Sequence, residues 1–121
     1  MAKGHSTVHG RIEVSPQAIS TVASRAVMDS YGVVGLAHPH RRNGLVEILQ
    51  RDAYHKGVEV RLEPDDQIVI DLYVVVEYGT RISEVARNVA SAVKFAVEKA
   101  LGLPVMQVNV NVKGIRVSDR D

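Results

Sequence analysis

Residues 58–77 read Val-Glu-Val-Arg-Leu-Glu-Pro-Asp-Asp-Gln-Ile-Val-Ile-Asp-Leu-Tyr-Val-Val-Val-Glu, and this stretch decides the fold. From Val58 to Glu63 apolar residues alternate with charged ones, and from Ile68 to Glu77 aliphatic residues recur at every second position. Such a period is typical of a strand with one buried face. Pro64-Asp65-Asp66 supplies turn residues between the two runs. The stretch predicts a β-hairpin whose core-facing residues in the second strand are Ile68, Ile70, Leu72, Val74 and Val76.

A helix and another strand are predicted after the hairpin. From Ile82 to Leu101 the apolar residues keep helical spacing, and Gly102 stands where a left-handed residue commonly ends a helix. Pro104 then opens an alternating run, whose apolar members are Met106, Val108, Val110 and Val112. We therefore expect a helix over 82–101 and a strand from Pro104 onward.

The chain before the hairpin predicts a tail, a strand, a helix and a long loop. Residues 1–7 are polar, and residues 8–14 alternate between apolar and polar side chains. Ser15 suits an N-cap and Pro16 the first helical position, so a helix is expected from Pro16 to about Ser30. Residues 32–57 give a weak signal, interpreted as a loop with one or two helical turns near 45–49.

The predicted order β-α-β-β-α-β indicates the α+β class. Because each strand has one apolar and one mostly polar face, we expect a two-layer sandwich in which both helices cover the same face of a four-stranded, mostly antiparallel sheet. Right-handed crossovers suggest a ferredoxin-like strand order. A single domain over 8–115 is expected, with a charged C-terminal tail at 116–121.

Composition narrows the classes of function. The 121 residues fit one domain, with 45% hydrophobic and 24% charged residues, as in a folded globular protein. The net charge of +1 provides no bulk attraction to nucleic acid or anionic lipid. The absence of cysteine excludes disulfide scaffolds, thiol nucleophiles, thiolate zinc sites and iron–sulfur clusters. We expect neither a membrane span nor a secretory signal.

Residues that could carry chemistry are few. The sequence has no Walker-type loop, no G-x-S-x-G elbow and no H-E-x-x-H helix. His38 and His40 can contribute two imidazoles to a metal site, but no nearby Asp, Glu or Cys completes a ligand set. Exposed loop histidines are the simpler interpretation, and a solvent-facing turn is the simpler one for Asp65-Asp66. No enzyme, cofactor or metal is therefore expected.

A nucleic-acid-binding module is the alternative function. Gly32-Val-Val-Gly35 matches the G-x-x-G loop of KH domains, and Arg41 and Arg42 follow it. The intervening valines are not basic, however, and no clear helix starts after Gly35, so Gly32 is interpreted as the end of the first helix.

The sheet face opposite the helices is the predicted interaction surface. Tyr73 is the one aromatic residue placed there, and carboxylates such as Glu59 and Asp71 beside it would repel the phosphates of RNA. An apolar centre with a polar rim resembles a protein interface, and its candidate residues are Val69, Tyr73, Val75, Asn109 and Asn111. In the competing interpretation, the 32–57 loop folds back and covers this face.

Several segments resemble the alkaline shock protein family of bacterial envelope stress response proteins, also called general stress proteins. The similar segments are Asp71-Leu-Tyr-Val-Val-Val-Glu-Tyr-Gly79, Ile82-Ser-Glu-Val-Ala86, Ala96-Val-Glu-Lys99, Leu101-Gly-Leu103 and Val108-Asn-Val-Asn-Val-Lys-Gly-Ile115. Gly10-Arg-Ile-Glu-Val-Ser15, followed by a helix and Gly32-Val33, is similar too.

The resemblance implies a cytoplasmic, non-enzymatic protein that self-assembles and lies beneath the membrane through a membrane-anchored partner. It supplies no catalytic residues to transfer. This sequence departs from the family pattern in its loop His38-Pro-His-Arg-Arg42 and its short tail, where we expect contacts of its own from His38, His40, Arg41 and Arg42.

Overall fold

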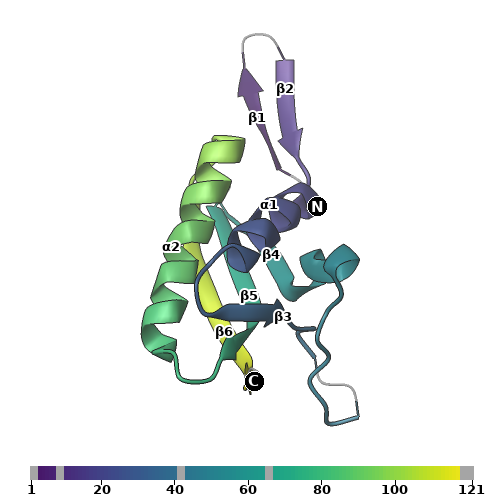
Figure 1. The fold of residues 1–121 in the computed structure, drawn as a ribbon. Coiled ribbons are helices and arrows are strands. Elements are labelled where there is room, and N and C mark those ends of the chain that lie inside the picture. The colour runs from purple at the N-terminus through teal and green to yellow at the C-terminus, as the bar shows by residue number, and fades with distance from the viewer. Residues whose placement is uncertain (1–2, 8–9, 41–42, 65–66, 118–121) are drawn as a thin grey trace.

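The computed structural model describes residues 3–7, 10–40, 43–64 and 67–117, with the backbone alone described for 3–7 and 10–13. It contains two α-helices, a 3₁₀ helix and two sheets within these ranges (Figure 1). The elements follow in the order β1 (Lys3–Thr7), β2 (Gly10–Val14), α1 (Pro16–Met28), β3 (Val33–Leu36), η1 (Arg51–Gly57), β4 (Val58–Glu63), β5 (Gln67–Glu77), α2 (Ile82–Leu101) and β6 (Val105–Arg116).

The main sheet is built around β5. Along one side of β5 lie β4 and β3, both antiparallel to it and placed end to end, since Val58–Glu63 pair with 67–72 and Val33–Leu36 with 74–76. Along the other side runs β6, which pairs parallel to β5 from Ile68 to Glu77. The predicted β4–β5 hairpin and the predicted strand β6 are confirmed.

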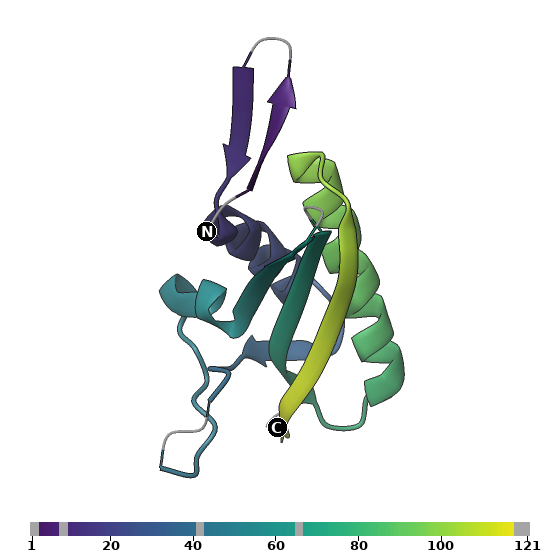
Figure 2. The same ribbon diagram turned by 180° about the vertical axis from the view of Figure 1, so that it is seen from behind.

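Both helices cover the same face of this sheet, as Figures 1 and 2 show. The core between the layers joins the inward residues of β5 to the buried stripes of the helices, and its fully buried members include Ile19, Val27, Ile70, Leu72, Val74, Val89, Val93 and Val97. The α+β two-layer prediction is therefore confirmed.

The helix ends follow the predicted local chemistry. Ser15 caps α1 by accepting a hydrogen bond at Oγ from the backbone N–H of Ala18 at 3.1 Å, and Pro16 occupies the first turn. α1 ends at Met28, two residues before the predicted end. α2 spans the predicted Ile82–Leu101 and ends at Gly102, which is left-handed at φ 68°.

The four strands of the main sheet are not the four that the sequence predicts. Of the expected strand at 8–14, residues 8–9 lie outside the described residues and residues 10–14 form β2. Among the described strands, β2 pairs with β1 alone, in a separate two-stranded sheet. β3, inside the segment expected to be a loop, takes the fourth place, so the ferredoxin-like order is not confirmed. Residues 3–7, expected to be a tail, form β1.

The predicted helical turns near 45–49 are wrong. This segment is extended, because the N–H of His38 donates to the carbonyl of Glu47 and that of Leu49 donates to the carbonyl of Leu36, both at 2.8 Å. The bridge between Ala37 and Ile48 continues the sheet beyond β3. The helical turns occur later, in η1.

Candidate interaction surface

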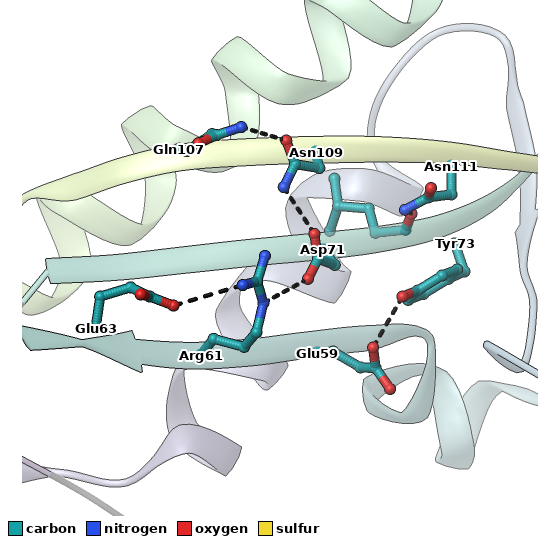
Figure 3. A network of polar contacts seen from close by, with 9 residues as sticks. Glu59, Arg61, Glu63, Asp71, Tyr73, Gln107, Asn109 and Asn111 are labelled. Carbon is teal, nitrogen blue, oxygen red and sulfur yellow. Dashed lines mark hydrogen bonds and ion pairs between the residues drawn. The ribbon is translucent and has the colours of Figure 1, made fainter.

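The sheet face opposite the helices, here called the open face, carries a network of polar side chains from three strands. Figure 3 shows these side chains together: Glu59, Arg61 and Glu63 from β4, Asp71 and Tyr73 from β5, and Gln107, Asn109 and Asn111 from β6. Strand alternation places them there, because the neighbouring residues of β5 point into the core.

Asp71 is the centre of one half of the network. Its carboxylate accepts a hydrogen bond from Arg61 Nε at 3.0 Å on the β4 side and from Asn109 Nδ2 at 2.8 Å on the β6 side. Arg61 also reaches Glu63 at 3.4 Å, and Gln107 donates to Asn109 at 2.7 Å. The hydrogen bond and charge of Asp71 raise the pKa of Arg61 above its ordinary value. The network therefore joins all three strands through one carboxylate.

Tyr73 anchors the other half. Its hydroxyl donates to Glu59 at 2.8 Å, and Lys113 Nζ lies 6.0 Å from the centre of its ring. Partial burial, the hydrogen bond to Glu59 and the nearby carboxylates raise the pKa of Tyr73 to about 12. Asn111 Nδ2 donates to the backbone carbonyl of Leu72 at 3.1 Å. The phenol and the amide are thus held in defined positions.

The predicted apolar centre of this face is wrong. Val69 and Val75 lie on the open face but are each only 3% exposed. In register, Val69 lies between Arg61 and Gln107, whose side chains are longer, and Val75 lies between Gly35 and Gly114. Of the five predicted interface residues, the structure brings Tyr73, Asn109 and Asn111 to the polar surface.

The loop that follows β3 does not roof the open face. Its described part pairs beside the end of β3 and then extends past the edge of the main sheet, as Figure 2 shows. Near Val75, Ile48 Cγ2 lies 3.5 Å from the position that a Cβ on Gly35 would take, and Ile48 itself is 50% exposed. Coverage of the open face by the described part of the 32–57 loop, which was the competing interpretation, is therefore confined to the margin next to β3.

The loop residues singled out from the sequence have local roles where they are described. His38 Nδ1 accepts a hydrogen bond from the backbone N–H of His40 at 3.1 Å, and the two rings lie 5.9 Å apart. Arg41 and Arg42 lie outside the described residues. Gly32 and Gly35 do not flank a loop, because Val33–Leu36 form β3, so the KH-like interpretation of this segment is wrong.

Some members of the network escaped the sequence analysis. Arg61, Gln107 and Lys113 were not singled out as site residues, although Arg61 has the alternation parity of Glu59. Gln107 and Lys113 likewise have the alternation parity of Asn109, so this local pattern was the signal that could have found them.

Two hollows of the described surface belong to the helix layer. One of about 480 Å³ lies between α1 and η1 and includes Arg25, Asp29, Arg51, Asp52 and His55. Another of about 750 Å³ lies between α1 and α2 beside Phe95 and Lys99. Sequence analysis did not point to either one.

No group of three or more His, Asp or Glu side chains is placed to hold a metal ion within the described part of the chain. Among the described helices, none is both long enough and apolar enough to cross a membrane.

The sequence of the chain is similar to those of known proteins. YloU of Bacillus subtilis is 46% identical over 114 residues, covering 93% of this chain and 94% of YloU. YqhY of the same species is 31% identical, covering 93% and 82%. A stress response regulator gls24 homolog of Streptococcus pyogenes is 23% identical, covering 95% and 64%. No solved structure matches the chain. Residues 4–117 match the alkaline shock protein 23 family, described as having a "cell envelope-related function", and the chain belongs to this family.

Proposed function

We propose that this chain is a non-enzymatic, cytoplasmic interaction protein of the envelope stress response that assembles with its own copies and docks on a membrane-anchored partner protein. The open face is the observation that supports the proposal. Both helices cover one side of the sheet, and the other side presents polar side chains that are already held in place (Figure 3).

Ordered side chains suit specific binding. Immobilising long side chains on binding costs conformational entropy and so weakens the association. This cost is smaller where hydrogen bonds have already fixed the side chains. Arg61 and Tyr73 belong to the residue types that most often dominate binding energy at protein interfaces. The carboxylates and amides around them keep further lone pairs and N–H groups for a partner.

The charge of the open face favours a protein as the partner. The carboxylates of Glu59, Glu63 and Asp71 outnumber the cations of Arg61 and Lys113. A surface with excess negative charge is repelled by the phosphates of nucleic acids and by anionic lipid headgroups. We therefore place the membrane contact in a protein that is itself anchored.

A charge-reversal pair tests the docking face. Glu59→Lys with Glu63→Lys alters the open face on β4, and Asp29→Lys with Asp52→Lys makes the same charge change on exposed residues of the helix layer. Bacterial membranes should retain the wild type and the control variant but release the open-face variant. Protein-free anionic vesicles and protease-treated membranes should bind neither the wild type nor the control.

Sedimentation velocity over a micromolar concentration series tests the assembly. The wild type should form species larger than the monomer as concentration rises. In the membrane experiment, retention of the open-face variant at the wild-type level would show that the open face is not the docking surface. A wild type that stays monomeric throughout the series would remove the self-assembly.

A further inference from the structure

Two features lack a partner among the described elements, and the first is the N-terminal hairpin. Among the described elements, β1 and β2 pack substantially only on each other. Figures 1 and 2 show the hairpin projecting past the end of the two-layer body. An isolated two-stranded hairpin is marginally stable in water. This hairpin therefore gains stability if one of its strands pairs with another sheet.

The second feature is the outer edge of β6. Over its 12 residues, β6 pairs with β5 and with no other described strand. Short length, proline and charge are the usual protections of an edge, but Val105–Arg116 contain no proline and are charged only at Lys113 and Arg116. Three large apolar side chains of β6 are exposed, with Met106 at 48%, Val112 at 36% and Ile115 at 53%. This edge is a template for another strand.

The residue pattern of β2 matches that of β6. Val108 and Val110 of β6 pack toward the core, while Asn109 and Asn111 belong to the open face. β2 reads Gly10-Arg-Ile-Glu-Val14, with the same alternation of apolar and polar residues. A strand of this pattern laid beside β6 continues both faces of the sheet, the apolar one with residue 12 and the polar one with residues 11 and 13.

We infer that β2 of one molecule adds to the free edge of β6 in a second copy of this chain. The inference rests on the self-assembly in the proposed function and names the two surfaces that produce it. The N-terminal hairpin is here called the arm. Because the arm and the accepting edge of β6 are different surfaces, the contact is heterologous. Reciprocal exchange closes a dimer, and one-way exchange continues into a ring or a filament.

Cysteine crosslinking tests this pairing directly, because the chain has no cysteine of its own. One chain carries Arg11→Cys, and a second, distinguishable by mass, carries Gln107→Cys, Asn109→Cys or Asn111→Cys. A disulfide forms only where the two Cα atoms come within about 7 Å. We expect a mixed disulfide with at least one β6 position. Ser91→Cys, on an exposed position of α2, is the matched control and should give none.

A second variant keeps the test independent of the crosslinking register. Ile12→Asp places a charge on the apolar side of the arm, and it should abolish the larger species that the wild type forms. It should leave the urea midpoint of the dilute protein unchanged, because residue 12 belongs to a hairpin whose strands have substantial contacts only with each other among the described elements.

The outcomes separate this inference from the proposed function. If the wild type assembles but Ile12→Asp assembles equally and no mixed disulfide forms, the arm is not the contact, while self-assembly stands. Disulfides only between two β6 cysteines would replace the arm by edge-to-edge pairing of β6. If the wild type never assembles, both the inference and the proposed self-assembly fail.

Discussion

Tyr73 lies where the polar network meets the central strand, and its environment keeps the phenol neutral. Burial first, then the hydrogen bond to Glu59 and the nearby carboxylates, raise its pKa to about 12. We predict that Glu59→Gln lowers this pKa while leaving it above the ordinary value of about 10, because the burial remains. The difference in phenolate absorbance between each protein and its Tyr73→Phe derivative measures it. An unchanged pKa would mean that Glu59 does not act on the phenol.

The same shift predicts how stability depends on alkaline pH. A raised pKa in the folded state means that folding favours the protonated phenol. The stabilisation is complete below the unfolded pKa of about 10 and is lost as pH rises toward the folded value of about 12. Urea midpoints measured across this window should fall more steeply for the wild type than for Tyr73→Phe. Parallel curves would count against this contribution of Tyr73.

Gly32 is required both by its backbone conformation and by the close approach of Val85, and Gly79 is a control that separates the two effects. Its φ is 88°, and a Cβ built on it would stand 2.6 Å from Val85 Cγ2. Gly79 has φ 92°, but its Cβ would meet no atom within 4 Å. Gly79→Ala should cost about 1 kcal/mol of unfolding free energy from backbone strain alone. Gly32→Ala should cost a further ~1–3 kcal/mol from the overlap, and equal costs in urea unfolding would contradict the clash.

In α2, the side of the helix on which a residue lies affects stability more than the size of its side chain does. Val85, Val89, Val93 and Val97 form its buried stripe, while the larger Phe95 is 65% exposed. Val93→Ala should lower the unfolding free energy by about 1–3 kcal/mol, because it leaves a cavity in the core. Phe95→Ala should change it by less than about 0.5 kcal/mol. Urea unfolding compares the two, and a larger loss at Phe95 would mean that its ring is covered by another contact.

Elements with long periodic patterns could be predicted, and short ones could not. α2 and β5 carry enough repeats for their buried faces to be identified from spacing alone. β3 has four residues, and it becomes a strand because β5, some 40 positions later, offers it backbone partners at Val74–Val76. The extended segment before η1 likewise depends on pairing with Leu36 and His38. Local pattern contains no information about such partners.

The candidate site was partly predictable for the same reason. Alternation assigned Tyr73, Asn109 and Asn111 to the open face correctly, because parity is a local property. The burial of Val69 depends on its register beside Arg61 and Gln107. Val75 lies between two glycines that have no side chains, and Ile48 from the loop after β3 lies beside one of them, so its surroundings depend on pairing far along the chain. The polar network around Asp71 follows from the same register. A single strand shows which face a residue takes, but not what covers it.

At the scale of the whole molecule, one body and one arm have different sources of stability. The two-layer body has its own core. Among the described elements, the hairpin strands have substantial contacts only with each other, and Val14 at the end of β2 packs against that core. If the arm binds a second copy, assembly stabilises the folded state by mass action. The thermal midpoint of the wild type should then rise with protein concentration. That of a chain lacking residues 1–13, which removes β1 and all of β2 except Val14, should stay constant and equal the dilute wild-type value. A lower midpoint for the truncated chain at every concentration would show instead that the hairpin stabilises its own body.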